Sequence, residues 1–546
     1  MTAQRWGTRV GLVLAMAGNA VGLGNFLRFP AQAAQHGGGA FLLPYLVSFL
    51  LMGIPLLWVE WAIGRHGGQY GHHSAPGMLD RMGRGRWLKY VGVFGLFTNL
   101  TVAAYYCYIE SWSLAYVWHS AVGTFHDVAP TAFFPSYLGL EEASIYAVPG
   151  EALFWFLLTL GLNVWILSRG LSRGIEAAAK IGLPLLIVFG VVLAVRGLTL
   201  GPNDPGVVQS PLAGLNFVWE PKPAGLLDPT TWLAAAGQVF FTLSVGMGSV
   251  HCYAAYVRRD QDIALNAAAA GWMNEFVEVV LGGSILIPIA TAYLGLAAVG
   301  AATAGGSGLG LGFLTLPTLF HHWGWFAPVA GAMWFGLLFF AGITSSLAMG
   351  QPIVAFLEDE LGVRHRRATL LFGLATLLLG FVCVWLYPGG SFDEFDFWSG
   401  TFALVLFALG EVVIFAWVFG MDRGWEEITR GADLRVPRFF RFAIRYVTPL
   451  FILVVFVGAL FKPVGRWGDA LQRLATGDGW RFAPDSVIGK VLHVGDARYA
   501  WVDEAGRFTH ALVQDATRTL LVAVFAGCAF LVWWAWRRKA RHGSAR

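Results

Sequence analysis

Glycine and asparagine are concentrated in one short stretch near the beginning of the chain. Residues 18–25 read GNAVGLGN and interrupt a segment that is otherwise mostly apolar. Both residue types are poor helix formers, and a helix break at membrane depth persists only where it is buried in protein or lines a polar cavity. The freed carbonyls suit a hard cation, and the N-termini of half-helices suit a carboxylate. The stretch therefore predicts a binding site.

The overall composition places this site in a membrane. Of the 546 residues, 56% are hydrophobic and 13% are charged, whereas a soluble domain has roughly 25% charged residues. Apolar stretches of about 20 residues, the length a helix needs to cross a bilayer, recur along the chain. The twelve spans that we predict are centred near residues 20, 52, 103, 159, 186, 242, 280, 343, 376, 407, 451 and 526. We expect an all-α polytopic protein in a lipid bilayer, and a large soluble core is disfavoured.

The sixth predicted span contains a second glycine-rich stretch. Residues 245–249 (VGMGS) resemble residues 21–25 (VGLGN), 224 positions earlier. The two breaks lie five spans apart, and an odd number inverts the second half relative to the first. Interrupted spans at corresponding positions of two inverted halves indicate a substrate site near the bilayer midplane. The sequence thus predicts a five-plus-five inverted repeat whose first and sixth helices are broken at mid-membrane.

These spans divide the chain into six parts. They are a first inverted repeat (spans 1–5) at 1–200, a second (spans 6–10) at 229–424, span 11 at 440–461, an extracytoplasmic loop at 462–518, span 12 at 519–537 and a basic cytoplasmic tail at 538–546. Within the loop, residues 489–513 alternate apolar and polar residues around two glycine turns, which predicts a small β-hairpin. An unstructured loop is the alternative.

Basic residues are distributed unevenly between the two sides of the predicted membrane. The short connections on one side hold only Arg196 and Lys222, whereas most of the 37 Lys and Arg lie on the other side. Cytoplasmic loops carry such an excess. We therefore expect both termini in the cytoplasm. The membrane is expected to be the inner (plasma) membrane of a bacterium. No cleavable signal peptide is expected.

The broken-helix region lacks the residues of a catalytic centre. It contains no nucleophile–base pair and no group of metal ligands. Two groups of loop histidines have no carboxylate or cysteine at metal-ligand spacing: His66, His72 and His73 in the first inner loop, and His321 with His322 in an outer one. We expect solvated histidines in both loops. The sequence therefore predicts no enzyme, no organic cofactor and no nucleic-acid partner.

Several motifs together resemble one family of transporters. They are residues 18–30, 37–41 (GGGAF), 60–61 (EW), 105–106 (YY), 110–112 (ESW), 237–242 (GQVFFT), 274–275 (NE) and 341–346 (AGITSS). The chain from about residue 5 to 460 resembles the neurotransmitter:sodium symporter family, and most of all its bacterial leucine-transporting members. This resemblance implies a symporter that moves an amino acid together with sodium.

The resemblance implies two sodium ions with oxygen ligands. The first ion would be held by the substrate carboxylate and by Ala20, Asn25, Thr242 and Asn274. The second would be held by Gly18, Val21, Ala341, Thr344 and Ser345. Because the first ion shares the substrate's carboxylate, the ion strengthens the binding of the substrate and the substrate strengthens the binding of the ion. For the two hydroxyls of the second site, hydrogen bonds to the preceding helical turn are the alternative.

The resemblance also implies a substrate pocket between the broken helices. Its residues are Asn19, Ala20, Leu23, Gly24, Val102, Tyr106, Phe241, Thr242, Ser244, Met247, Ser345 and Met349. Gly24 and the Tyr106 hydroxyl would hold the substrate carboxylate, while Ser244 and backbone carbonyls would hold its ammonium group. Monoamine-transporting relatives carry an aspartate where this chain has Gly22, so the glycine favours an α-amino acid that brings its own carboxylate.

Two methionines distinguish this pocket from that of the leucine-transporting members. Met247 and Met349 stand where those members have phenylalanine and isoleucine. Because methionine is unbranched and adapts to different shapes, we expect neutral hydrophobic L-amino acids of the leucine or methionine class, with tolerance for aromatic ones. A volume-conserving change without effect on specificity is the alternative.

Charged residues flank the pocket in the family pattern. Arg28 and Asp396 resemble an outer gate, and Asp359 resembles half of an inner gate for which Arg5 is the candidate partner. Animal relatives that bind chloride have a serine where this chain has Glu278. We therefore expect this carboxylate to substitute for chloride and transport to be chloride-independent.

The leading hypothesis is a sodium-coupled amino acid symporter that works by alternating access. A non-transporting amino acid sensor on the same fold is the alternative. A membrane enzyme or a channel is disfavoured, and the oligomeric state stays open, with a homodimer as one option.

Overall fold

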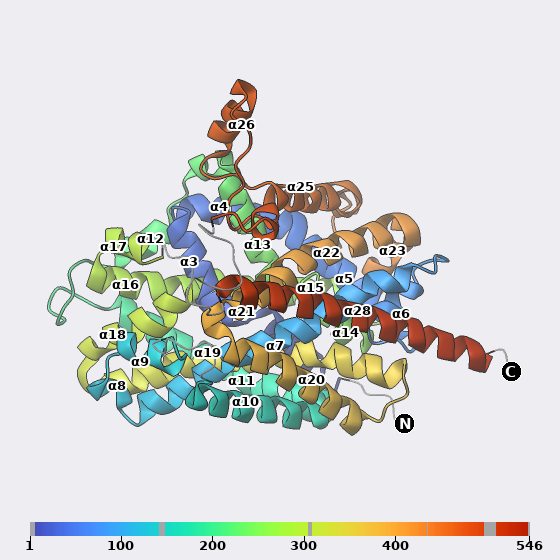
Figure 1. Ribbon diagram of the computed structural model, residues 1–546, viewed down its shortest axis with the longest axis horizontal. Helices are drawn as coiled ribbons and strands as arrows, with labels where there is room; N and C mark the ends of the chain where they lie inside the picture. The colour runs from blue at the N-terminus through green and yellow to red at the C-terminus, as the bar shows by residue number, and fades with distance from the viewer. Residues whose placement is uncertain (1–5, 141–147, 304–307, 434, 496–508, 544–546) are drawn as a thin grey trace.

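The computed structural model describes residues 6–140, 148–303, 308–433, 435–495 and 509–543 (Figure 1). This part of the chain is folded into helices and contains no β-strand; one isolated antiparallel bridge joins Pro463 and Phe482. The fold is therefore all-α, which confirms the predicted class.

Most of the twelve predicted membrane spans consist of several consecutive helical segments. The first six are built from α1 (Arg9–Ala20), α2 (Leu23–Phe26) and α3 (Arg28–Gln35); α4 (Gly39–Ser48), η1 (Phe49–Gly53) and α5 (Ile54–Gly68); α7 (Leu88–Ala121); α10 (Gly150–Ser168); η2 (Leu171–Glu176) and α11 (Ala177–Leu198); and α13 (Pro229–Leu243) and α14 (Ser249–Ala255). The next six are built from α15 (Ile263–Glu275), η4 (Phe276–Leu281), η5 (Gly282–Ser284) and α16 (Leu286–Leu294); η6 (Gly310–Thr315), α18 (Leu316–Phe320), η7 (His321–Phe326) and α19 (Ala327–Asp359); α20 (His365–Trp385); α21 (Ser391–Phe397), η9 (Trp398–Ala403), α22 (Leu404–Val413), η10 (Ile414–Gly420) and α23 (Met421–Thr429); α24 (Phe439–Phe442), η11 (Ala443–Val447) and α25 (Thr448–Leu460); and α28 (His510–Gly543). Short helices between the spans are α6 (Ala75–Asp80), α8 (Thr124–Asp127), α9 (Pro130–Tyr137), α12 (Pro211–Trp219), η3 (Pro223–Leu227), α17 (Leu296–Thr303), η8 (Tyr387–Gly389), α26 (Trp467–Thr476) and α27 (Val487–Val491).

The number of spans agrees with the sequence only if both broken helices are counted. In the described part of the chain, 10 helices are long and apolar enough to cross a membrane, and the bent pair at the N-terminus brings the number to 11. The sixth predicted span is outside that number because residues 244–248 divide it into α13 and α14, which are each too short to span a bilayer. Twelve spans are consistent with the structure and stay a prediction.

The two breaks occur where the sequence analysis placed them. The first span bends by 60° between Ala20 and Leu23. In the second break Ser244, Gly246 and Gly248 have φ values of 52°, 71° and 94°, a left-handed conformation that glycine adopts without steric cost and other residues rarely adopt. An additional Cβ at Gly246 would lie 2.4 Å from the Leu404 carbonyl oxygen, so the close approach of α22 also requires glycine there.

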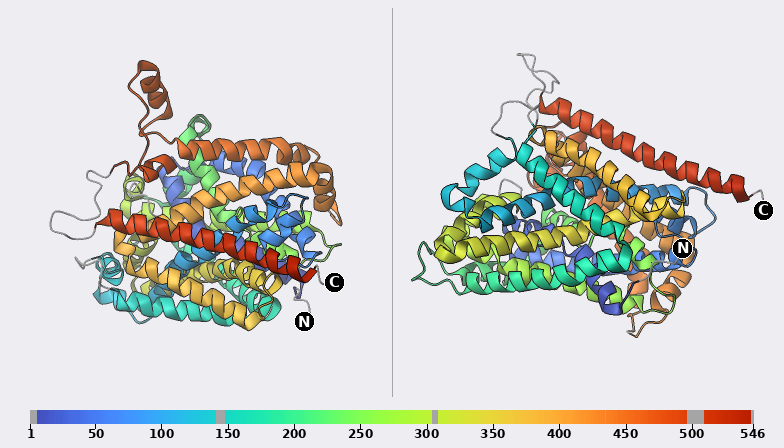
Figure 2. Two further views of the ribbon diagram at one scale, coloured as in Figure 1. Left: turned by 45° about the vertical axis from the view of Figure 1, so that its right-hand side comes forward. Right: turned by 90° about the horizontal axis from the view of Figure 1, so that it is seen from below.

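The interior of the bundle is built around α7. This helix packs along α19 and also contacts α6, α10, α20 and α28 (Figures 1 and 2). In the most apolar part of α7, 89% of the residues are buried inside the protein, compared with 22% in α28. The C-terminal helix therefore lies on the outside of the bundle, as the right-hand view of Figure 2 shows, and presents most of its apolar surface to lipid.

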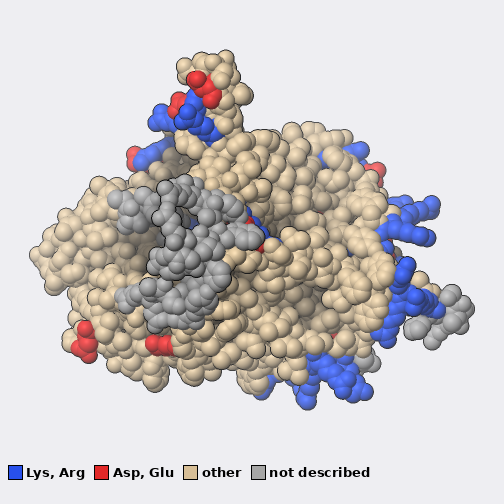
Figure 3. Space-filling model, viewed as in Figure 1, with Lys and Arg blue, Asp and Glu red and all other residues tan. Residues whose placement is uncertain are grey.

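The two ends of the molecule differ in charge. Both termini lie toward the same end in all three ribbon views (Figures 1 and 2). On the face drawn in Figure 3, Lys and Arg gather at that end and also, together with acidic groups, on the projecting segment around α26, while the opposite end shows a few acidic groups. A basic end of this kind is typical of a cytoplasmic face.

The loop at 462–518, predicted to be extracytoplasmic, differs from the β-hairpin expected from the sequence. Residues 487–491 form helix α27, and Ser486 caps it by accepting a hydrogen bond from the Gly489 N–H at 2.8 Å. The prediction of a first β-strand in this region is thus wrong, because the stabilisation from a helix cap outweighs the weak alternation of a few apolar and polar residues. The expected second strand falls in residues 496–508, outside the described part. Helix α28 already begins at His510, nine residues before the predicted start of span 12 at 519.

Candidate substrate and ion site

A small cavity lies among four elements: the two broken spans, helix α7 and helix α19. Ten of the twelve predicted substrate residues line it: Ala20, Gly24, Val102, Tyr106, Phe241, Thr242, Ser244, Met247, Ser345 and Met349. Gly22, Asn25 and Gly400 line it as well. None of these side chains is charged, so the cavity offers no partner to a charged side chain of a substrate.

Asn19 and Leu23 are the two predicted pocket residues that do not line the cavity. Their backbone groups connect its walls. The Ser244 hydroxyl donates a hydrogen bond of 2.9 Å to the carbonyl of Asn19, which joins the two broken helices to each other. The N–H of Leu23 donates to the Tyr106 hydroxyl at 2.9 Å. These bonds occupy backbone groups that the helix breaks would otherwise leave unpaired.

Two glycines of the first break are required by close contacts. A Cβ at Gly22 would lie 2.6 Å from the Tyr106 hydroxyl and 3.1 Å from the Ser345 hydroxyl, and one at Gly24 would lie 2.6 Å from the Phe241 ring. Contacts below 3.0 Å force neighbouring atoms to move. An aspartate at position 22 therefore does not fit this arrangement, which agrees with the expectation of a substrate that carries its own carboxylate.

The polar residues predicted for the first sodium site come together around Glu278. The Asn25 side-chain amide donates to the Asn274 oxygen at 2.8 Å, and the Asn274 amide donates to the Thr242 hydroxyl at 2.9 Å. The Glu278 carboxylate accepts hydrogen bonds from both asparagine amides at 3.3 and 3.2 Å, from Gln238 at 2.6 Å and from the Thr242 hydroxyl. All five residues are buried. A buried carboxylate among oxygen ligands is suited to compensating the charge of a hard cation.

The residues predicted for the second sodium site also converge. The Ser345 hydroxyl lies 3.3 Å from the Gly18 carbonyl oxygen, 3.5 Å from that of Val21 and 3.2 Å from that of Ala341. The Thr344 hydroxyl donates to carbonyls of its own preceding turn at 3.0 and 3.2 Å. Both hydroxyls therefore donate hydrogen bonds to carbonyls of the preceding helical turn, which is the alternative to sodium binding. The same oxygen atoms lie where the ligands of a cation would lie.

On the outer side, the expected ion pair is not formed. The Arg28 guanidinium lies 4.6 Å from the centre of the Phe241 ring, and the Asp396 carboxylate accepts a hydrogen bond of 2.7 Å from the Tyr105 hydroxyl. Within the described residues, no ion pair joins Arg28 to Asp396. The cation–π contact still places the arginine directly against a residue of the pocket wall.

On the inner side, Asp359 has a partner that sequence reasoning missed. Its carboxylate accepts a hydrogen bond from the His73 backbone N–H at 2.8 Å and lies 3.0 Å from the His73 ring nitrogen. The expected partner Arg5 lies outside the described residues. His72 is buried, 2.7 Å from the Glu360 carboxylate. The prediction of solvated loop histidines is therefore wrong for His72 and His73, because their acidic partners lie nearly 290 positions further along the chain. His321 and His322 are exposed, as predicted.

The class of protein follows from comparison with known families. A sequence profile described as "Sodium:neurotransmitter symporter family" matches residues 3–129 and 127–468. The chain belongs to this family, which uses sodium to drive transport across a membrane.

Individual relatives give the same assignment. An uncharacterized sodium-dependent transporter of Methanocaldococcus jannaschii is 28% identical over 84% of this chain and 91% of its own length. The sodium-dependent nutrient amino acid transporter 1 of Drosophila erecta is 25% identical over 83% of this chain and 77% of its own length. The crystal structure of MhsT in complex with L-phenylalanine superposes with a TM-score of 0.71 at 30% identity, covering 83% of this chain and 99% of that one. The chain is a membrane transporter and not an enzyme.

Proposed function

We propose that the protein is a symporter of neutral hydrophobic L-amino acids, driven by two sodium ions and working by alternating access. The observation that carries the proposal is the cavity itself, in which hydroxyls and backbone groups of the broken helices are combined with the apolar side chains of Val102, Met247 and Met349. A charged substrate side chain would be desolvated there without a partner, which is costly. Relatives described as amino acid transporters, and the phenylalanine in MhsT, support this substrate class.

The proposed stoichiometry rests on the two clusters of oxygen ligands. One lies around Asn25, Thr242 and Asn274, and the other around Thr344 and Ser345. Each sodium ion entering along the membrane potential contributes about 2.3 kcal/mol per 100 mV, so two ions drive steep accumulation. The orientation that we propose has both termini in the cytoplasm of a bacterial inner membrane, in line with the basic end in Figure 3.

Uptake of labelled leucine into proteoliposomes tests the proposal. With an inward sodium gradient we expect accumulation that stops when potassium replaces sodium. Unlabelled leucine, methionine and phenylalanine should compete, whereas aspartate and lysine should not. Sodium-dependent binding without accumulation would favour a sensor on the same fold, and better competition by aspartate or lysine would contradict the apolar pocket.

We expect the exchange of Met247 for phenylalanine to narrow the specificity. Met247 lines the cavity, and a rigid ring removes the adaptability of the methionine side chain. Overpacking costs about 1–3 kcal/mol, so affinity for phenylalanine should fall roughly 5- to 100-fold relative to that for alanine. Competition uptake measures this ratio. Met273→Phe is the control, because Met273 is half-buried in α15 and does not line the cavity, and it should leave the ratio unchanged. An unchanged ratio in Met247→Phe would show that Met247 has no role in specificity.

A further inference from the structure

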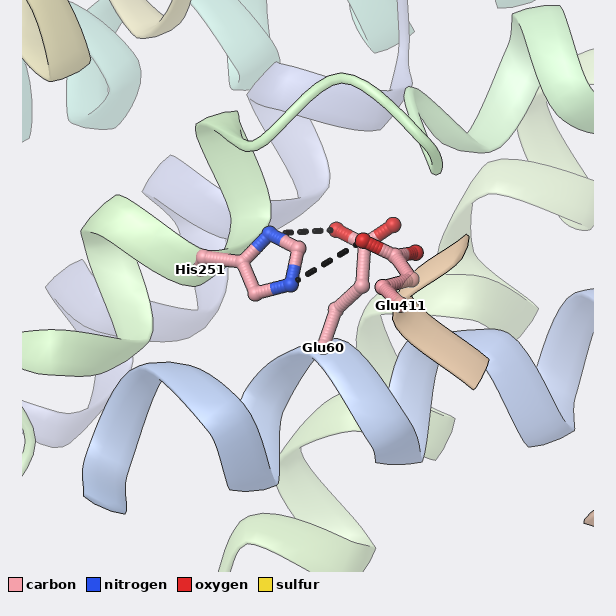
Figure 4. A group of neighbouring side chains, drawn as sticks. All are labelled: Glu60, His251 and Glu411. Carbon is pink, nitrogen blue, oxygen red and sulfur yellow. Dashed lines mark ion pairs between the residues drawn. The ribbon is translucent and has the colours of Figure 1, made fainter. Parts of the chain in front are cut away.

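Three ionisable side chains meet in the interior of the bundle without contacting the substrate cavity. Glu60 from α5, His251 from α14 and Glu411 from α22 are each 0% exposed. The His251 Nδ1 atom lies 3.4 Å from a Glu60 oxygen, and its Nε2 atom lies 3.2 Å from a Glu411 oxygen (Figure 4). The two carboxylates come from different helices and lie side by side at the same edge of the imidazole ring (Figure 4).

Most of the polar atoms in this group have no hydrogen-bond partner within the described residues. These atoms are both ring nitrogens of His251, Glu60 Oε2 and both carboxylate oxygens of Glu411. The other Glu60 oxygen accepts a hydrogen bond of 2.5 Å from the N–H of Gly246. Buried polar atoms without partners are costly, so the group as a whole is built to hold a ligand that satisfies them.

Among the described residues, no Lys or Arg forms an ion pair with this group. The charged groups that face His251 come from α5 and α22 and are the two glutamates. Helix α7 presents Asn99, whose amide donates to the Met247 carbonyl at 2.6 Å, and α22 also presents the Phe407 ring, 5.9 Å from the imidazole centre. With both carboxylates ionised and the imidazole neutral, the group would carry two uncompensated negative charges in a dry interior, which is strongly unfavourable.

Two protons are sufficient to neutralise this group without a metal ion. A metal ion is the competing ligand, since one possible ligand atom from each of the three side chains lies within 4.8 Å of the others. An imidazolium has an N–H at both ring nitrogens. One proton on His251 and one on Glu411 neutralise the group, while Glu60 stays ionised and accepts the hydrogen bond from Gly246.

We propose that Glu60, His251 and Glu411 form a proton-binding site that holds two protons while the substrate cavity is closed and releases one when the break in the sixth span opens. Gly246 is the link, since it belongs to the same break, residues 244–248, as the cavity residues Ser244 and Met247. Opening the break removes the Gly246 hydrogen bond and admits water, which lowers the cost of a net negative charge. Closure around a substrate then takes up one proton from solution, and by linkage a proton strengthens substrate binding.

The pH dependence of substrate binding tests this proposal, and this arm rests on the function proposed above. Labelled leucine is bound to the purified protein at saturating sodium between pH 6 and 9. Uptake of one proton per substrate predicts an affinity that weakens by up to about tenfold per pH unit on the alkaline side. In His251→Gln, which keeps size and polarity but cannot become a cation, this slope should largely disappear. His119→Gln, which removes a histidine 2.6 Å from a glutamate outside the cavity, should keep it. Equal slopes in wild type and His251→Gln would overturn the proposal.

A second arm needs no substrate. The infrared carbonyl band of a protonated carboxylic acid should be present in the wild-type protein at pH 7 and reduced by one group in Glu411→Gln but not in Glu60→Gln. An unchanged band in Glu411→Gln overturns the proposal even if no transported amino acid is found. So does elemental analysis that finds one transition-metal ion per chain in the wild type and none in His251→Gln, because a metal would then be the ligand.

Discussion

Replacing Glu278 by serine is expected to make transport depend on chloride. Glu278 is the carboxylate that Asn25, Thr242 and Asn274 contact through hydrogen bonds, in the place where we propose the first sodium ion. Without it, the positive charge of that ion is not compensated in a buried site. Breaking a buried charge pair costs about 3–5 kcal/mol, so uptake without chloride should fall roughly 100-fold or more. Chloride can enter the space that the shorter side chain leaves and restore the negative charge.

The measurement is leucine uptake with gluconate or chloride as the anion. Wild type should be indifferent to the exchange, whereas Glu278→Ser should be active only with chloride. Glu110→Gln is a suitable control, because Glu110 is equally buried but is bound by Asn163 and has no contact with the cluster. If the wild type itself stopped in gluconate, the carboxylate would not be substituting for chloride.

Replacing Gly22 by alanine is expected to abolish most of the substrate affinity. The added methyl group would lie 2.6 Å from the Tyr106 hydroxyl and 3.1 Å from the Ser345 hydroxyl. Tyr106 is the proposed partner of the substrate carboxylate, and it is already positioned by the N–H of Leu23. Either the tyrosine or the broken segment must move, and a misplaced group of this kind costs about 1–3 kcal/mol. We expect leucine affinity to fall about 5- to 100-fold.

Equilibrium binding of labelled leucine at saturating sodium measures this loss. Gly161→Ala is the matched control, since nothing lies within 4 Å of a Cβ at that position of α10, and it should bind like the wild type. Thermal unfolding separates a local effect from a general loss of structure. Wild-type affinity in a folded Gly22→Ala protein would show that the close contact does not control the pocket.

Both breaks could be located from the sequence because the signal is local. Clusters of glycine and asparagine in apolar segments cannot continue a helix, whatever surrounds them. Ala20, Thr242 and Ser345 were expected at the site for a different reason, the resemblance of their motifs to a known family, and all three line the cavity. The extracytoplasmic loop shows the limit of local patterns, as a capped helix, α27, occupies residues in which alternation predicted a strand.

The sequence by itself determined that the protein is a helical membrane protein with two interrupted spans, because hydropathy and helix propensity act over neighbouring residues. That it is a transporter was indicated by motifs that resemble a known family. Only the tertiary structure decided which distant side chains become partners. It placed Arg28 against Phe241 and left Asp396 with Tyr105. It also brought Glu60, His251 and Glu411 together from three helices. Their charges interact through a dry interior in which a few ångströms decide the energy, and no spacing along the chain records such distances.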